Sequence, residues 1–104
     1  STAEIFNSCA ISVSPRSMKN IRLAAAQAAD ELLDIQGVKA SFVIYFDNDV
    51  VNVSARSMGD VNVQPLMEKL GGGGHQTMAG AQIENTDVEQ VKEKVMAMIT
   101  AINN

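Results

Sequence analysis

Residues 42–56, with the sequence FVIYFDNDVVNVSAR, have the pattern of two β-strands joined by a tight turn. Residues 38–46 end in a β-branched and aromatic run, which is typical of a central strand. Residues 47–49 (Asp-Asn-Asp) are turn formers, and they lack the following ligands that a calcium loop would need. Apolar and polar residues then alternate over residues 50–56, with Asn52, Ser54 and Arg56 on one face. We therefore predict a β-hairpin.

Further elements are expected on both sides of this hairpin. Residues 5–13 read as a first strand, and Ser14 and Pro15 supply the N-cap and first position of a helix of roughly 20 residues that ends at Gly37. After the hairpin we expect a short helix over residues 63–70 and a strand over residues 79–84. A capping box over residues 86–89 opens a final helix. The buried stripe expected on that helix comprises Val88, Val91, Val95, Met98 and Ile102.

This order of elements predicts one α/β domain, in which three helices flank a mixed sheet of about four strands in the order β-α-β-β-α-β-α. The length of 104 residues fits a single core. The formal charge of −4 argues against a general nucleic-acid coat protein, which would carry a basic stripe. The single cysteine, Cys9, excludes an intramolecular disulfide and a cysteine-based zinc site.

The chain contains no apolar run near the ~20 residues of a membrane helix. It starts with Ser1 rather than methionine and lacks the charged and apolar regions of a secretory signal. Such a start fits either processing or a piece taken from a longer protein.

Four consecutive glycines, Gly71, Gly72, Gly73 and Gly74, precede the only histidine, His75. Glycine adopts positive φ and lets the backbone approach a ligand, so that successive amides form a concave anion site. A flexible linker is the ordinary alternative, but only about thirty residues follow, too few for a second ordinary domain. We therefore expect a phosphate-binding loop, and we expect Gly73→Val to be harmful because a β-branched residue resists positive φ.

Three polar residues before the glycine run are further candidates. Arg56 offers a permanently charged, planar set of donors that suits a phosphate group, and Ser57 follows it at the end of the strand. Asn62 precedes the short helix. Three of the candidates have an ordinary alternative: a solvated arginine for Arg56, a helix N-cap for Asn62 and a loop histidine for His75. Their convergence beside one sheet edge favours a common pocket.

These residues resemble a known family, the DHHA1 domain of the DHH phosphoesterase superfamily. The resemblance rests on residues 54–57 (SARS) with residues 62–63 (NV), on the GGGGH run and on residues 78–81 (MAGA). Residues 27–33 and 38–43 look most like bacterial cyclic-di-AMP phosphodiesterases. Related domains occur in nano-RNases that hydrolyse 3′-phosphoadenosine 5′-phosphate, in RecJ exonucleases and in alanyl-tRNA synthetases. The family often has two alanines before the glycine of its last motif, and Met78 replaces the first here.

The resemblance implies that residues 1–104 are a substrate-binding domain, whose partner is a separate DHH domain that holds two manganese ions. This chain has no Asp-His-His triplet and one histidine, so we expect it to bind no metal and to be inactive alone. Arg56 and Ser57 would contact the phosphate or base of a phosphorylated dinucleotide. The amides of Gly72, Gly73 and Gly74 with the His75 side chain would hold the non-reacting phosphate, and Asn62 is a weaker candidate.

The resemblance also implies a place in the cell. The domain would be cytoplasmic and would not touch the membrane, to which a separate N-terminal segment would tether the parent protein. A homodimer formed through the parent protein is one arrangement that the resemblance allows. Two alternatives remain: hydrolysis of short oligoribonucleotides or 3′-phosphoadenosine 5′-phosphate by the same class of enzyme, or a nucleotide-binding module with no catalytic partner.

Overall fold

The computed structural model of the chain describes residues 3–14 and 18–102. Within these residues, one sheet has six strands in the order β1-β2-β3-β4-β6-β5. Strands β2 and β3 are parallel, and the other neighbours are antiparallel. The elements are β1 (Ala3–Phe6), β2 (Cys9–Ser14), α1 (Ile21–Leu32), β3 (Ala40–Asp47), β4 (Val50–Ser57), α2 (Val63–Lys69), β5 (Gly73–Gly74), β6 (Met78–Ile83) and α3 (Val88–Ile102).

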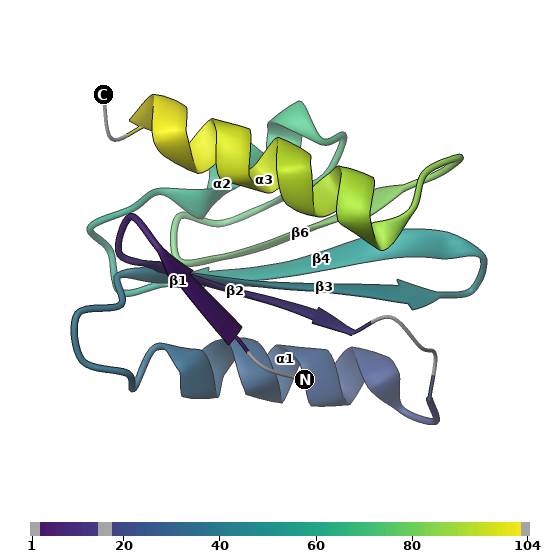
Figure 1. Cartoon of the computed structure of the whole chain (residues 1–104), viewed down its shortest axis with the longest axis horizontal. Helices are drawn as coiled ribbons and strands as arrows, with labels where there is room; N and C mark the ends of the chain where they lie inside the picture. Colours follow the sequence, from purple (N-terminus) through teal and green to yellow (C-terminus); the bar gives the residue numbers. More distant parts are fainter. Residues whose placement is uncertain (1–2, 15–17, 103–104) are drawn as a thin grey trace.

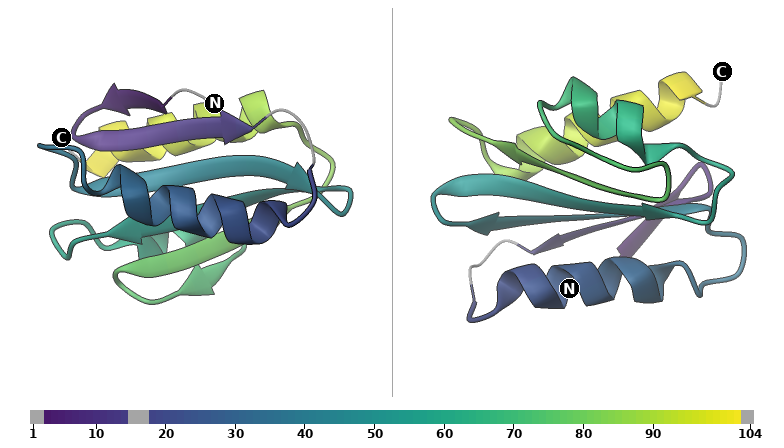
Figure 2. Two further views of the ribbon diagram at one scale, coloured as in Figure 1. Left: turned by 90° about the horizontal axis from the view of Figure 1, so that it is seen from below. Right: turned by 180° about the vertical axis from the view of Figure 1, so that it is seen from behind.

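The helices cover the two faces of the sheet unequally. Figure 1 shows α1 on one face and α2 with α3 on the other, and Figure 2 shows the same layers from below and from behind. The main core lies between the sheet and α2 with α3, where Phe42, Met67 and Ile99 are fully buried. A smaller core under α1 comprises Ile21, Ala25, Ala29, Val43 and Tyr45. The predicted α/β class, with a mixed sheet and three helices, is confirmed.

The central hairpin is also confirmed. Strands β3 and β4 pair from Ala40 with Ser57 to Asp47 with Val50. Asn48 and Asp49 have φ values of 56° and 64°. Two consecutive residues with positive φ are the requirement of the hairpin turn whose twist matches that of the flanking strands.

The sheet has six strands instead of about four for two local reasons. The first strand predicted over residues 5–13 is in fact a hairpin, because Asn7 and Ser8 turn the chain with φ values of 51° and 65°. The other addition is β5, which lies inside the glycine run and pairs with β6. Asn7 and Ser8 are short polar residues that can adopt positive φ, so they form the turn between β1 and β2. A glycine there would have indicated the turn in the sequence, but neither residue is one.

The predicted bounds of the first helix were wrong. Ser14 is not its N-cap but the last residue of β2, where it pairs with Tyr45. Pro15, predicted at the first helical position, lies outside the described residues. The helix begins at Ile21 after Asn20, and it ends at Leu32 rather than at Gly37. The amides of Leu33, Asp34 and Ile35 donate to carbonyls three residues earlier, which tightens the chain before Gly37.

The final helix differs from prediction in detail. The capping side chain is Asp87, whose carboxylate accepts a hydrogen bond of 2.8 Å from the amide of Gln90, and not Thr86. The fully buried stripe is Val91, Val95 and Ile99, whereas Ile102 is exposed. These three residues are each four positions apart, so the buried face of the helix is rotated slightly from the predicted one, which continued through Met98 and Ile102.

The last two glycines of the run form β5, which pairs with β6, and Gly72 just before β5 also lies close to β6. This close approach explains two of the glycines. A Cβ on Gly72 would lie 2.0 Å from the carbonyl oxygen of Gly80, and a Cβ on Gly74 would lie 2.5 Å from the Cα of Ala79. Gly74 also has a φ of 141°. Gly73, in contrast, lacks a positive φ, and a Cβ there would meet no atom within 4 Å. The expectation that Gly73 needs a positive φ was therefore wrong.

We predict that Gly72→Ala lowers the free energy of unfolding by about 1–3 kcal/mol, because the added methyl group must push two backbones apart. Gly73→Ala is the matched control, since it adds the same group at the next residue, where it meets open space, and it should change stability by less than about 0.5 kcal/mol. Urea unfolding of both variants makes the comparison. Equal losses in the two variants would contradict the close approach of β5 to β6.

Candidate functional site

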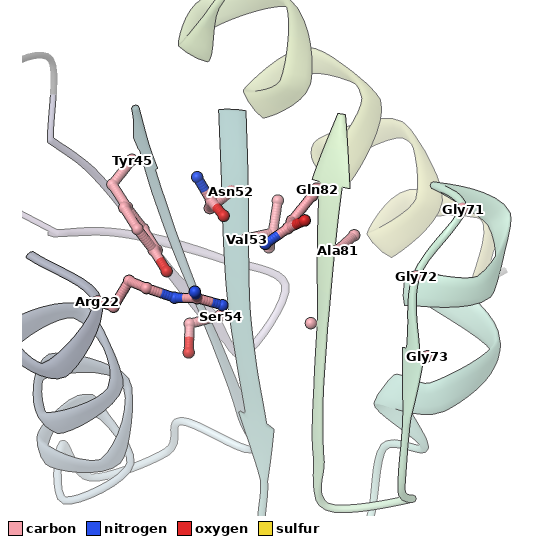
Figure 3. A pocket seen from close by; sticks show the side chains of 11 residues that line it. Arg22, Tyr45, Asn52, Val53, Ser54, Gly71, Gly72, Gly73, Ala81 and Gln82 are labelled. Atoms are coloured by element: carbon pink, nitrogen blue, oxygen red, sulfur yellow. The ribbon is translucent and has the colours of Figure 1, made fainter. Parts of the chain in front are cut away.

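A groove of about 560 Å³ lies on the α1 side of the sheet, over β4, β6 and the glycine run (Figure 3). Helix α1 packs over β3 and part of β4 and leaves the same side of the sheet uncovered over the rest of β4, β6 and β5. We call this uncovered side the open face. We call the groove itself the glycine groove. Its polar lining comes from four elements: Arg22 of α1, Tyr45 of β3, Asn52 and Ser54 of β4, and Gln82 of β6.

Main-chain atoms form much of the floor of the glycine groove. The sheet register aligns Ser54, Gly80 and Gly73 in one row across β4, β6 and β5. Two of these three positions carry no side chain. Because glycine lets other atoms approach the backbone closely, the floor is flat and offers peptide groups to a ligand. Gly80 itself has little room for a side chain, since a Cβ there would lie 3.0 Å from the carbonyl oxygen of Val53.

Arg22 and Tyr45 form the wall of the glycine groove on the side next to α1 (Figure 3). Burial raises the pKa of the Tyr45 phenol, and the charge and hydrogen bond of Arg22 oppose this change. The phenol is therefore protonated at neutral pH and is available as a hydrogen-bond donor or acceptor. Arg22 adds a permanent positive charge to a chain whose net charge is −4.

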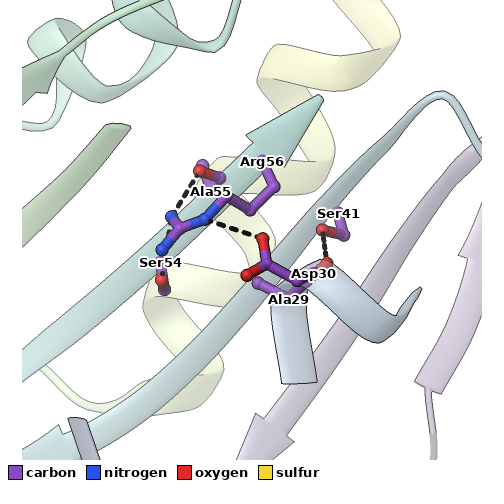
Figure 4. Close-up of polar contacts among 6 residues, drawn as sticks. All are labelled: Ala29, Asp30, Ser41, Ser54, Ala55 and Arg56. Carbon is purple, nitrogen blue, oxygen red and sulfur yellow. Dashed lines mark hydrogen bonds and ion pairs between the residues drawn. The ribbon is translucent and has the colours of Figure 1, made fainter. Parts of the chain in front are cut away.

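Arg56 borders the glycine groove at Ser54. Its Nη1 donates to the Ser54 hydroxyl at 3.3 Å and to the Ala55 carbonyl at 2.9 Å, and its Nε donates to the Asp30 carboxylate at 3.2 Å (Figure 4). The other terminal nitrogen, Nη2, donates to no described residue. No buried side-chain nitrogen or oxygen in the described ranges lacks a partner, so Nη2 is accessible to solvent. Arg56 therefore keeps donors for a ligand while the rest of its head group is held.

His75 lies at the end of β5, in the turn that leads to β6. Its amide donates to the carbonyl of Met78 at 2.7 Å, and Met78 is the register partner of Arg56. Arg56 and His75 thus lie in one row of the sheet, two strand spacings or about 10 Å apart. The side chain of His75 is exposed. The row places the two predicted phosphate-binding residues at the same end of the open face.

Ser57 and Asn62 belong to a different part of the structure. The Ser57 hydroxyl donates to the carbonyl of Gln76 at 3.4 Å and accepts from the amide of Gly59 at 3.3 Å. Asn62 caps α2, since its side chain accepts a hydrogen bond of 3.1 Å from the amide of Gln64. The N-cap alternative for Asn62 is therefore confirmed. Ser57 thus ties the end of β4 to the turn that carries His75, whereas the Asn62 side chain bonds within α2.

The amides of the glycine run are partly engaged within the chain. Gly71 donates to the carbonyl of Glu68 at 3.0 Å, and Gly72 donates to that of Met67 at 2.8 Å. Gly71 has a φ of 89°, which ends α2 in the manner typical of a C-terminal glycine. Of the glycines predicted to bind phosphate, Gly72 and Gly73 line the glycine groove. Gly74 does not line it and packs instead against Ala79.

Sequence reasoning missed Arg22, Tyr45, Asn52, Ser54 and Gln82 as residues of the open face. The alternation over residues 50–56 placed Asn52 and Ser54 on the same face as Arg56, so that signal was present in the sequence. The position of α1 on the sheet was not, and it brings Arg22 beside Tyr45. Asn52 has a structural task as well, because its Nδ2 donates to the carbonyls of Asp47 and Val50 and so braces the central hairpin.

Two negative findings concern the described residues. Among residues 3–14 and 18–102, no group of three or more His, Cys, Asp and Glu side chains is placed to hold a metal ion. None of the helices over these ranges has the length and apolar character to span a membrane.

Comparison with known proteins identifies the class of domain that this fold and groove define. A family model of the DHHA1 domain matches residues 19–104. The chain belongs to the DHHA1 domain family, which confirms the resemblance seen in the sequence.

Two relatives are cyclic-di-AMP phosphodiesterases. The chain is 46% identical over 78 residues to PdeA of Listeria monocytogenes and 52% identical over 75 residues to GdpP of Geobacillus thermodenitrificans. These matches cover 74% and 71% of this chain but only 12% and 11% of the two relatives. The similarity therefore concerns a small part of much longer proteins.

A solved structure of an exopolyphosphatase-related protein from Bacteroides fragilis has the same fold. Its TM-score is 0.77 at 18% identity, and the match covers 98% of this chain and 33% of the other. At this identity the likeness concerns the fold alone.

We predict that Asn62→Ala lowers the free energy of unfolding by about 0.5–2 kcal/mol, the usual cost of losing an N-cap. Because the Asn62 side chain accepts from the start of α2, affinity for a phosphorylated ligand should stay within about twofold. Gln64→Ala is the control, because it removes a half-buried side chain that bonds to Glu68 in the same helix, without removing the cap. Chemical denaturation and a ligand titration of the two variants measure both effects, and a large loss of affinity at full stability would give Asn62 a place in the site.

Proposed function

We infer that this chain is the substrate-binding domain of a larger DHH-type phosphodiesterase that hydrolyses cyclic-di-AMP to pApA. The observation that carries the inference is the identity of 46% and 52% to two cyclic-di-AMP phosphodiesterases, aligned over most of this chain. In the proposal, residues 1–104 form one DHHA1 domain, and the reacting phosphodiester is cut by groups outside it.

The geometry of the open face supports a phosphorylated ligand. The glycine groove, at about 560 Å³, has the size of a small-molecule site. Arg22 lines it and Arg56 borders it, which gives the face two permanent positive charges on an acidic chain. Phosphate groups are bound well by arginine, because its planar head group offers parallel charged donors.

Each predicted site residue has a distinct task in the proposal. Arg56 and the His75 side chain donate to phosphate oxygens, and the glycine strand lets the ligand approach the sheet. The amide of Gly72 already donates to Met67, so an anion would have to share that bond. Ser57 holds the loop between β4 and α2 in place, and Asn62 caps α2, so both act on the site indirectly.

The proposal places the metal ions in a separate DHH domain of the parent protein. Two manganese ions there would activate the attacking water and stabilise charge on the phosphoryl group. In the proposal, this chain's own contribution is to bind and orient the substrate. A cytoplasmic site, a membrane tether in the parent and a homodimer formed through the parent remain predictions of the family resemblance.

An amide NMR titration of the domain with pApA, cyclic-di-AMP and 3′-phosphoadenosine 5′-phosphate tests the proposal. We expect shifts over the open face, including Ser54, Arg56 and residues 71–80, with the two dinucleotides ahead of the mononucleotide. Preference for 3′-phosphoadenosine 5′-phosphate would favour the alternative substrate. Absence of shifts with every ligand at millimolar concentration would contradict binding by this domain on its own.

We predict that His75→Ala weakens binding of pApA by about 1.5–3 kcal/mol, the value of a hydrogen bond to a charged group. Thr77→Ala is the matched control, because Thr77 is an exposed residue of the same turn whose side chain makes no hydrogen bond to a described residue. Both variants should keep the wild-type melting temperature, since both side chains are exposed. Isothermal titration calorimetry makes the measurement, and equal affinity of the two variants would remove His75 from the site.

A further inference from the structure

Two neighbouring hydrogen bonds, made by Ser41 and by Arg56 with Asp30, join α1 to the sheet (Figure 4). Ser41 and Arg56 are register partners on β3 and β4. The Ser41 hydroxyl donates to the carbonyl of Ala29 at 2.6 Å, and the Arg56 Nε donates to the carboxylate of Asp30, the next residue of the helix. Two sheet neighbours thus hold two consecutive residues of α1.

Ser41 fixes the helix at this point. It is fully buried, and its hydroxyl bonds to Ala29 where the helix begins to tighten, because the amide of Leu33 donates to Asp30, three residues earlier. A buried polar group is costly unless it is hydrogen-bonded, so the contact between Ser41 and Ala29 is a firm one. The backbone of Asp30 is therefore placed relative to β3.

Asp30 in turn fixes Arg56. The Arg56 side chain is 11% exposed, whereas that of Asp30 is 64% exposed. Because its carboxylate partner is exposed to solvent, such an ion pair contributes little to stability, about 0–1 kcal/mol. Its geometric effect is larger: with Nε bonded to Asp30 and Nη1 to β4, the plane of the guanidinium is set, and Nη2 is left for a ligand.

We propose that Asp30 and Ser41 are positioning residues, which hold the guanidinium of Arg56 ready for an anionic ligand on the open face. This inference rests on the proposed function, because it concerns the arginine assigned there to a phosphate. Neither residue touches the ligand. A side chain that is ordered before binding loses less conformational freedom on binding, which is worth about 3- to 10-fold in affinity for one long side chain.

Asp30→Ala and Glu31→Ala form the decisive pair of variants. Both remove one negative charge from neighbouring exposed positions of α1, and the Glu31 side chain makes no ion pair with a described residue. Loss of charge alone would strengthen the binding of an anion in both. We expect instead that Asp30→Ala binds pApA about 3- to 10-fold more weakly than Glu31→Ala in calorimetry. Equal affinities, or tighter binding by Asp30→Ala, would overturn the proposal.

The NMR signal of the Arg56 Nε–H reports directly whether Asp30 holds the guanidinium. A general loss of stability would not change this signal in the way described next. We expect Asp30→Ala to shift this signal and speed its exchange with water, and Asp30→Asn, which keeps an acceptor oxygen, to restore part of the wild-type behaviour. Ser41→Ala should move the same signal in the same direction. An unchanged Nε–H signal in Asp30→Ala would show that Asp30 does not hold Arg56.

Binding of pApA by the wild-type domain distinguishes failure of the proposed function from failure of the positioning role. If the wild-type domain binds no pApA, the proposed function fails and Arg56 has no ligand to be held for. If the wild-type domain binds pApA but Asp30→Ala and Glu31→Ala bind it equally, the proposed function stands and the positioning role is wrong.

Discussion

The close approach of β5 to β6 is the constraint on which the open face depends. A Cβ on Gly74 of β5 would lie 2.5 Å from the Cα of Ala79, and one on Gly72, just before β5, would lie 2.0 Å from the carbonyl oxygen of Gly80, closer than Cβ atoms approach in proteins. The glycine run is therefore pressed flat against the sheet and does not behave as a linker. Because β5 is held there, Gly73 joins Ser54 and Gly80 in one row, and His75 is carried to the end of the same face.

The other contacts of the site follow from that placement. The turn after β5 positions Gln76, whose carbonyl accepts from Ser57 and from the amide of Val63, and whose side chain donates to Gly59. The loop between β4 and α2 is thereby tied to the glycine strand. On the other side of the groove, α1 brings Arg22 and Asp30 beside the sheet. The open face is thus framed by a helix edge and a glycine edge, with β4 and β6 between them.

The central hairpin could be predicted from sequence because two independent signals coincide there. The run over residues 42–46 favours a strand by side-chain type, and Asn48 with Asp49 tolerates the positive φ that the turn needs. The turn at Asn7 and Ser8 carried only the second signal, in weaker form, so one strand was predicted where a hairpin exists. The start of α1 was misplaced because Ser14 fits an N-cap locally, whereas tertiary pairing with Tyr45 keeps it in β2.

From the sequence, the residues of the candidate site could be predicted only where they share one strand or loop, and not where the site joins separate elements. Alternation along β4 places Ser54 and Arg56 on one face, and the resemblance to DHHA1 domains drew attention to the glycine run. The partners of Arg56 could not be found this way, because Asp30 lies 26 residues away in sequence and reaches it only through the packing of α1 on the sheet. The division between groove-lining Gly73 and sheet-packing Gly74 likewise depends on the pairing of β5 with β6.

Amide hydrogen exchange in the free domain tests the central claim most directly. If the glycine run is held against the sheet, the amide of His75, which donates to the carbonyl of Met78 in β6, should exchange far more slowly than that of an unstructured chain. Exchange of this amide at the rate of an unstructured peptide, while the core strands stay protected, would show a flexible linker and contradict the pairing of β5 with β6.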